Sequence, residues 1–301
     1  MTIRSVTSGL EDFRAWATDP TPRIGLGLPF FDKRTNGGLA KAECAMVLAY
    51  SSVGKTWIGL NAIANNPRIP TLFFSLEMSW RQVVSRVVAI TSGIPTWELE
   101  KMLRDGSTPQ QYIETGIHYP FLLGDDRSET GAKEMKQAIM DAGAKIGQPI
   151  RLVIIDYLEL MGGAGMLGKS EQVDKAAQKI RSIAKDCDCS VIVLHQVGKT
   201  DGSGGFEPLS LDSGKYGGHQ PMDYVIGAYA PRLNMKLTEH QRDDAQDELY
   251  LQLLKNRNGK AHPGGVRHKL DQTTGRITPW GEQIMFPTPS LSAYQPQMVG
   301  A

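Results

Sequence analysis

Short runs of apolar residues alternate with longer amphipathic stretches along most of the chain, starting at about residue 24. Four runs are rich in β-branched and large apolar residues and contain no alternating polar positions: 46–49, 71–75, 152–155 and 191–194. Strands that are buried on both faces have this pattern. The runs therefore predict the central strands of a sheet whose two faces are both covered.

The stretches between these runs carry apolar residues at helical spacing. They predict helices at 56–65, 79–92, 131–146 and 170–187. Further strand-like runs follow at 223–230, 248–255 and 266–270. Strands that alternate with helices favour parallel pairing, because each helix returns the chain to the same edge of the sheet. The sequence thus predicts an α/β fold with a mainly parallel central sheet flanked by helices.

The first residues predict a separate short helix at 8–17. Leu10, Phe13 and Trp16 recur at helical spacing, and Ser8 is expected to cap the helix. An amphipathic helix without a core of its own usually lies against another surface. We therefore predict three parts, with the middle one as the folded domain: an N-terminal linker helix or arm at 1–23, the domain at 24–280 and a flexible C-terminal tail at 281–301.

Composition narrows the class of protein. The chain has 301 residues, of which 41% are hydrophobic, and 33 basic against 32 acidic residues give a net charge of +1. This balance does not by itself indicate a nucleic-acid partner, although a basic loop inside a ring would not change it. Three cysteines argue against a disulfide framework and against a zinc site. With no apolar run of about 20 residues, we expect no membrane span and a cytoplasmic protein of a bacterial or phage-infected cell.

The strongest chemical motif runs from Ala49 to Thr56, between a predicted strand and a predicted helix. It ends in Gly-Lys-Thr, as a phosphate-binding loop does, with Ala49 in place of the usual first glycine. Lys55 is expected to reach the β- and γ-phosphates of ATP, and Thr56 to hold Mg²⁺. The alternative is a tight turn between strand and helix. The residues expected to surround the phosphates are Ser51, Ser52, Val53, Gly54, Lys55, Thr56 and Trp57.

Two acidic residues follow central strands, where open α/β sheets bind ligands. Asp156 ends the run at 152–155 and is predicted to support Mg²⁺, although an aspartate there can also cap a helix. Glu77 follows the run at 71–75 and is predicted to orient and deprotonate the attacking water. Taken alone, Glu77 is more typical of a solvated side chain.

Three more polar residues follow predicted strands. Gln196 comes after the run at 191–194, where a neutral amide can sense the γ-phosphate. Lys255 ends the run at 248–255, and Arg257 follows two residues later. Two exposed cations are usually solvated charge, but in a ring of identical subunits they can reach the nucleotide of the neighbour, as an arginine finger does.

Taken in order, these motifs resemble those of the DnaB-type replicative DNA helicases of superfamily 4. The resemblance covers roughly residues 24–280 and implies a RecA-like P-loop NTPase. It rests on segment 74–79 with Gln82 and Arg86, on 156–161, on 183–196 and on 255–259. It implies ATP hydrolysis by a hexameric ring on single-stranded DNA, with replication or recombination proteins as candidate partners. The matching catalytic positions are Lys55, Glu77, Gln196, Lys255 and Arg257.

Two departures from the family pattern qualify this resemblance. We expect the N-terminal collar domain of the family, which engages primase, to be absent, and the protein to be a minimal helicase or a relative with another task. In the family's DNA-contacting loop an arginine precedes the acidic residue, whereas Leu211 stands there in this chain. Backbone N–H groups and lysines can still contact phosphates. The DNA-contacting residues expected are Lys199, Asp212, Gly214 and Lys215.

Two other functions share these motifs. A RecA-like recombinase or recombination mediator would use the same phosphate loop and glutamate, but it would form filaments on DNA. A regulator that binds ATP without acting as a motor would need neither Glu77 nor Arg257 for catalysis. The amino-acid sequences of the motifs around Glu77 and at 255–259 favour the helicase.

Overall fold

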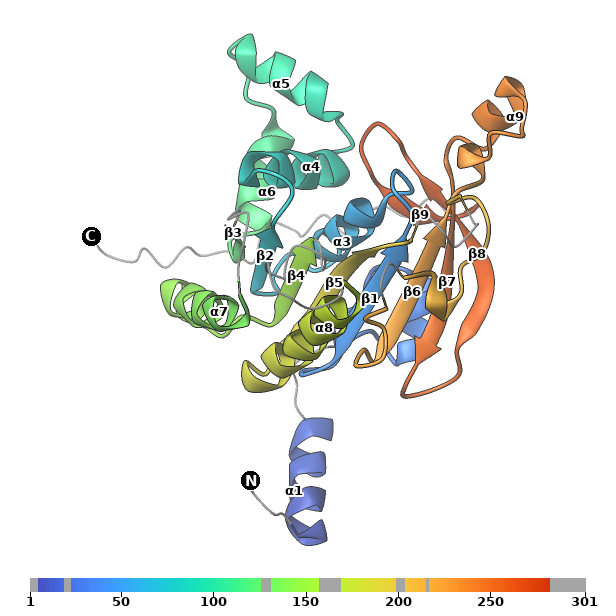
Figure 1. The fold of residues 1–301 in the computed structure, drawn as a ribbon. Helices are drawn as coiled ribbons and strands as arrows, with labels where there is room; N and C mark the ends of the chain where they lie inside the picture. The colour runs from blue at the N-terminus through green and yellow to red at the C-terminus, as the bar shows by residue number, and fades with distance from the viewer. Residues whose placement is uncertain are drawn as a thin grey trace.

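The computed structural model describes residues 5–18, 23–125, 131–156, 169–198, 204–214 and 217–281. Within these residues, one nine-stranded sheet has the order β3-β2-β4-β5-β1-β6-β7-β8-β9 (Figure 1). The strands are β1 (Cys44–Ala49), β2 (Thr71–Ser75), β3 (Leu122–Asp125), β4 (Leu152–Asp156), β5 (Ser190–Gln196), β6 (Tyr224–Tyr229), β7 (Glu248–Asn256), β8 (His262–Leu270) and β9 (Ile277–Pro279).

The sheet has a parallel part and an antiparallel part. Strands β3, β2, β4, β5, β1 and β6 all pair in parallel. Strands β7, β8 and β9 continue the sheet from β6 with antiparallel pairing. The carboxyl ends of the parallel strands therefore lie along one edge, which is where an α/β sheet binds ligands. We call this edge the phosphate-loop edge. The edge at which the parallel strands begin is called the opposite edge.

Helices cover both faces of the parallel strands, as the sequence predicts. Their bounds are α1 (Val6–Ala17), α2 (Pro29–Asp32), α3 (Lys55–Ala64), α4 (Trp80–Ser92), α5 (Thr96–Arg104), α6 (Gln110–His118), α7 (Ala132–Ile146), α8 (Lys169–Asp186) and α9 (Glu239–Asp244). Alternate side chains of each strand point to opposite faces, which separates two apolar cores. Helices α2, α3 and α4 pack into one core, and α7 and α8 pack into the other.

Helix α1 stands apart from these layers. It extends below the sheet in Figure 1, and none of its residues is buried. Its apolar side chains Leu10 and Phe13 are each 62% exposed, while the ring of Trp16 lies under the guanidinium of Arg23 at 5.3 Å. No described helix is both long and apolar enough to cross a membrane.

The sequence located every central strand and missed several peripheral elements. Helices α5 and α6 and strands β3 and β9 were not predicted. Strand β3 is short and contains Gly124, and β9 contains Pro279, so neither has a strong strand pattern. The cap of α1 was also assigned wrongly: Ser5, not Ser8, caps it, since the Ser5 side chain accepts a hydrogen bond from the Ser8 N–H.

Candidate nucleotide-binding site

The predicted phosphate loop joins β1 to α3 at the phosphate-loop edge. Gly54 precedes the first helical residue with a φ of 124°, a backbone conformation that side chains rarely allow, and Ser52 also has a positive φ of 69°. No side chain caps α3. The first N–H groups of an α-helix have no partner within the helix, and the helix dipole favours an anion at this end of α3.

Two residues from the last third of the chain, Arg232 and Leu270, contact the loop. Arg232 follows β6 and donates to the backbone oxygens of Ser52 at 2.9 Å and Val53 at 3.2 Å. Burial lowers the pKa of Arg232, and the charge of Asp247 opposes this shift. Leu270 at the end of β8 packs so near Gly54 that a Cβ there would lie 3.1 Å from it. The shape of the loop thus depends on residues that its own motif does not include.

The two residues predicted to bind the metal lie together. The hydroxyl of Thr56 donates to Oδ2 of Asp156 at 2.8 Å. Asp156 is only 1% exposed, and its Oδ1 has no hydrogen-bond partner among the described residues. Burial raises the pKa of this carboxyl, while Lys55 and the Thr56 hydroxyl act in the opposite direction. A buried carboxylate with an unmet oxygen is suited to a cation.

Glu77 lies beside this pair, because β2 is the neighbour of β4 and Ser75 pairs with Asp156. Its side chain is exposed at the phosphate-loop edge. Arg86 on α4 is a site residue to which the sequence assigned no role. Burial lowers its pKa, and the charges of the nearby Asp156 and Glu77 oppose this shift.

Trp57 and Gln196 complete the predicted set at this edge. Trp57 is half-buried, with the guanidinium of Arg86 lying 4.9 Å from the centre of its ring and Gly275 packed against it. Its side chain therefore supports Arg86 and also borders the loop, since a Cβ on Gly54 would lie 3.7 Å from its ring. Gln196 ends β5 in register with Ala49, the last residue before the loop. The structure thus places Gln196 next to the start of the phosphate loop.

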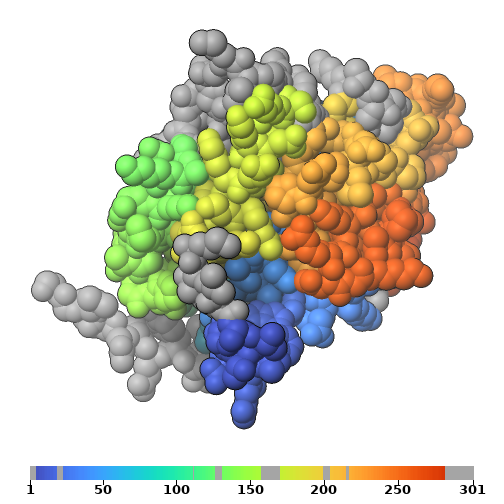
Figure 2. All heavy atoms as spheres, turned by 60° about the horizontal axis from the view of Figure 1, so that its bottom comes forward, coloured from blue at the N-terminus to red at the C-terminus, as the bar shows by residue number. Residues whose placement is uncertain are grey.

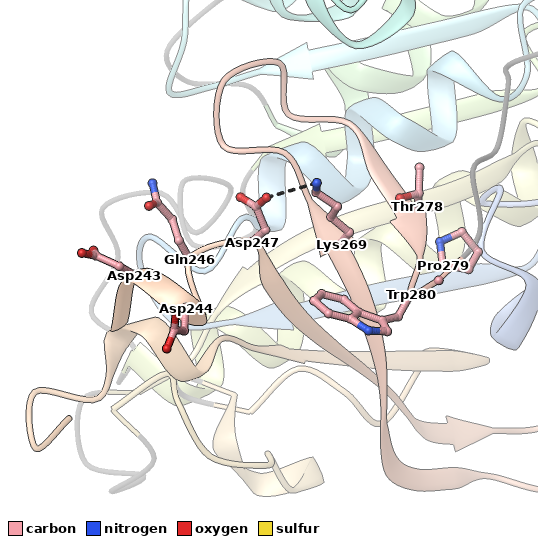
Figure 3. A pocket seen from close by; sticks show the side chains of 9 residues that line it. Asp243, Asp244, Gln246, Asp247, Lys269, Thr278, Pro279 and Trp280 are labelled. Carbon is pink, nitrogen blue, oxygen red and sulfur yellow. Dashed lines mark ion pairs between the residues drawn. The ribbon is translucent and has the colours of Figure 1, made fainter. Parts of the chain in front are cut away.

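A cleft of about 570 Å³ opens beside the loop, between α9 and the last strands (Figure 3). The N–H of Leu270 donates to the backbone oxygen of Asp247 at 2.8 Å, so the cleft begins one residue from the side chain that packs on Gly54. Lys269 and Asp247 form an ion pair across it at 3.4 Å. The indole of Trp280 is 42% exposed, and the guanidinium of Arg267 covers it at 3.4 Å. The cleft thus offers an aromatic ring and several carboxylates.

The two predicted trans-acting cations lie at the opposite edge. Arg257 follows β7, and its guanidinium bonds to Asp223 Oδ1 at 3.2 Å. The ammonium of Lys255 donates to the backbone oxygens of Gln220 at 2.7 Å and His219 at 3.2 Å. The length of β1, about 20 Å, separates this edge from the phosphate loop. Neither cation can therefore reach the phosphate loop of its own chain.

The predicted DNA-contacting residues are only partly within the described chain. Lys199 and Lys215 lie outside the described residues. Asp212 is exposed in a short 3-10 helix, whereas Gly214 is buried and bridges to Val197. Gly214 thus anchors the base of the loop to the end of β5.

The family model of the DnaB-like helicase C-terminal domain matches residues 24–274. The chain belongs to this DnaB-like helicase family. It is 30% identical over 186 residues to the replicative DNA helicase DnaB of a Synechocystis species, covering 58% of this chain and 21% of the relative. It is 28% identical over 246 residues to the DnaB of Treponema pallidum, covering 78% of this chain and 52% of the relative. The chain thus spans about half or less of the length of these DnaB relatives.

Solved structures give the fold of this DnaB-like domain. A protein solved as its ATPase domain alone superposes with a TM-score of 0.74 at 17% identity, covering 92% of this chain and 99% of that one. A DnaB-like replicative helicase, solved in a study of its interactions with primase, gives a TM-score of 0.72 at 17% identity, covering 93% and 67%. A KaiC-like protein of Pyrococcus horikoshii gives 0.55 at 15% identity, covering 86% and 100%. The expectation of a RecA-like fold is confirmed.

Proposed function

We propose that this chain is the ATP-hydrolysing motor of a DNA helicase and acts as a hexameric ring on single-stranded DNA. The observation that carries the proposal is the contact between Thr56 and Asp156 at 2.8 Å, beside an uncapped helix and within reach of Glu77. A phosphate loop, a metal-binding carboxylate and a candidate base then meet at one edge of the sheet. Membership of the DnaB-like family supports the same function.

The residues of this site fit a magnesium ion. Oδ1 of Asp156 is buried without a hydrogen-bond partner in the described chain, and the hydroxyl oxygen of Thr56 lies against the same carboxylate. Thr56 and Asp156 would hold the ion, which when bound neutralises charge on the β- and γ-phosphates. The positive charge of the metal would also favour the ionised carboxylate and so oppose the rise in the pKa of Asp156 that burial causes.

Each remaining residue has a task in hydrolysis. The N–H groups at the start of α3 bind the phosphates, and Lys55 carries the charge that faces them. Glu77 orients the attacking water and accepts its proton, because its carboxylate is exposed next to Asp156. Arg86 stays charged near Glu77 and Asp156 and limits their mutual repulsion. Gln196 contacts the γ-phosphate from the end of β5.

Lys255 and Arg257 act on the nucleotide of a neighbouring subunit. They lie about 20 Å from their own phosphate loop, measured along the strands. A head-to-tail arrangement brings the opposite edge of one subunit to the phosphate-loop edge of the next, and such contacts close into a ring. The cations then stabilise negative charge that develops on the transferred phosphoryl group.

The cleft beside the loop receives the nucleoside part of ATP. Carboxylates accept hydrogen bonds from ribose hydroxyls and base amino groups but repel phosphates, so the triphosphate lies on the loop and the base in the cleft. Trp280 offers a ring for stacking, since Arg267 covers one of its faces. This assignment fixes the direction in which the nucleotide lies across Gly54.

The test is the rate of ATP hydrolysis with and without single-stranded DNA, measured together with particle size. We expect DNA to stimulate turnover, Lys55→Ala to abolish it, and the native protein to form rings. Filaments on DNA that promote strand pairing would favour a recombinase instead. A monomer whose turnover ignores DNA would contradict the helicase proposal.

A further inference from the structure

Both trans-acting cations are held by one short stretch of chain, residues 217–223. The guanidinium of Arg257 bonds to the side chain of Asp223. The backbone N–H of Arg257 donates to the backbone oxygen of Asp223 at 2.9 Å. Lys255 donates to the carbonyl oxygens of His219 and Gln220. Burial lowers the pKa of Lys255, and the charge of Arg257 adds to this shift. The positions of both cations therefore depend on where this stretch lies.

Asp223 is fixed to the sheet more firmly than either cation. Its N–H donates to the Cys44 oxygen at 2.9 Å, and its Oδ2 accepts from the Cys44 N–H at 2.8 Å. The same carboxylate pairs with Arg181 of α8. Asp223 is 4% exposed and Arg257 is 46% exposed, so the carboxylate is a rigid support and the guanidinium reaches the surface. Figure 2 turns this edge toward the reader, with α8 in yellow beside the orange part of the chain.

The other end of the stretch is tied to the predicted DNA loop. Gly214 bridges to Val197 at the phosphate-loop edge, and Gly198 donates to the Ser213 oxygen at 2.9 Å. The chain then passes to the opposite edge, where Asp223 precedes β6. On the way, the N–H of Gly218 donates to Asp174 of α8 at 2.9 Å. Residues 217–223 thus connect the base of the loop with the supports of both cations.

We propose that Asp223 is the positioning residue for Arg257, and that residues 217–223 couple the loop after β5 to the trans-acting cations. The inference rests on the proposed function, because it assigns Arg257 to a neighbouring nucleotide. Arg181 takes part of the Asp223 charge, so Arg257 is oriented by Asp223 without being its only partner. Movement of the loop base shifts the carbonyls that hold Lys255 relative to the fixed carboxylate that holds Arg257. DNA bound at the loop then sets turnover at the neighbouring site.

The first test is a double-mutant cycle on DNA-stimulated ATP hydrolysis, with Asp223→Asn, Arg257→Ala and the double variant. Asparagine keeps the size of the side chain and one acceptor oxygen for the Cys44 N–H. We expect Asp223→Asn to lower kcat about tenfold or more with KM within about twofold. The double variant should match Arg257→Ala within about twofold, because Asp223 acts through Arg257. Losses that multiply would overturn the proposal and leave Asp223 a purely structural residue.

The second test does not depend on a buried charge. Asp174→Ala removes the acceptor of the Gly218 N–H from a partly exposed position, and Glu171→Ala is the matched control one turn earlier on α8. We expect Asp174→Ala to lower the ratio of DNA-stimulated to DNA-free turnover about threefold, and the control to keep that ratio. An unchanged ratio in Asp174→Ala would overturn the coupling. If Arg257→Ala itself retains full turnover, the trans-acting role in the proposed function fails instead.

Discussion

The two edges of the sheet differ in how far their polar groups are satisfied within one chain. At the phosphate-loop edge, Oδ1 of Asp156 has no partner in the described chain, α3 has no side-chain cap and Glu77 is exposed. At the opposite edge, Arg257 pairs with Asp223, and Lys255 pairs with two carbonyl oxygens. The polar groups of the first edge suit a ligand, whereas the cations of the second edge already have partners within the same chain.

This difference indicates how the two edges take part in one reaction. Leaving a buried group unsatisfied costs stability, and such groups are typical of sites that a ligand completes. Cations already paired in the chain gain less from a new anion, because each must exchange one partner for another. In the proposed ring, the phosphate-loop edge would therefore supply binding, and the opposite edge would supply a contact that forms only when a neighbour presents a phosphate.

The largest expected effect concerns whether Arg257 acts in trans. Arg257→Ala should lower kcat about 10³-fold or more, the range found for arginine fingers. Lys55→Ala should be equally inactive. A mixture of the two inactive variants should regain activity, because an interface between an intact loop and an intact Arg257 is complete. Steady-state hydrolysis of the mixtures measures this. A mixture that stays inactive, while both variants form native-sized rings, would place Arg257 outside the neighbour's site.

Glu77→Gln tests the edge that is prepared for the ligand. Loss of the base should lower kcat about 10²–10⁴-fold, while Mg²⁺ and ATP still bind because the contacts of Thr56 and Asp156 remain. Single-turnover hydrolysis and nucleotide binding separate the two steps. The matched control is Glu98→Gln at an exposed position in the first turn of α5. Equal loss of binding and turnover in Glu77→Gln would assign this residue to binding instead of proton transfer.

The sequence predicted the local part of the site better than the part assembled from distant residues. The phosphate loop is one contiguous motif between a strand and a helix, so its position follows from the chain alone. Asp156 and Glu77 could be placed near the loop because Asp156 ends β4 and Glu77 comes shortly after β2, and both strands end at the same edge. Arg232 was missed, since its contacts with Ser52 and Val53 join residues far apart in the chain. An isolated arginine after a strand carries no signal of such a contact.

The missed elements have a similar explanation. Helices α5 and α6 pack on α4 outside the sheet and bury little, as the 65% exposure of Trp97 shows, and each has only nine residues, so its apolar pattern covers few turns. Asp223 was also missed, because a single aspartate before a strand is typical of a turn. Its importance arises only from three partners that the fold brings together: Cys44, Arg181 and Arg257. The roles of Lys199 and Lys215 stay predictions.

Asp156→Asn tests the phosphate-loop edge through its effect on the folding stability of the chain. Burial raises the folded-state pKa of Asp156 above the ordinary value of 3.8. The stability that the protonated form contributes is therefore present below that value and is lost as pH rises through the raised pKa. Asparagine avoids this loss and can still accept the Thr56 hydrogen bond. We expect the variant, free of nucleotide at neutral pH, to be more stable by about 0.5–2 kcal/mol.

Chemical unfolding of both chains across pH measures this effect, and the gap should widen as pH rises from about 4. With Mg²⁺ and a non-hydrolysable ATP analogue at about 100 times its Kd, the native chain should gain about 2.7 kcal/mol, and the variant much less. The control is Asp186→Asn, because Lys136 and Ser182 lower the pKa of that exposed carboxyl. A variant at Asp156 that is less stable than the native chain would contradict the assignment of an unsatisfied metal site.

The smallest expected effect tests the cleft beside the phosphate-loop edge. Arg267 covers one face of the Trp280 indole, so the ring is held in place and stacking on its other face requires little ordering. A base stacked on an aromatic ring gains about 1–3 kcal/mol, and the lower value corresponds to about fivefold in Kd. Trp280→Ala should therefore weaken ATP binding about fivefold, with kcat unchanged because the phosphates still lie on the loop.

Tripolyphosphate, which lacks a base, should bind the native chain and the variant equally. Trp97→Ala is the control, since its ring is exposed on α5, a helix that lies well away from α3 in Figure 1. If tripolyphosphate binding weakens as much as ATP binding, Trp280 supports the loop itself, and the base lies elsewhere.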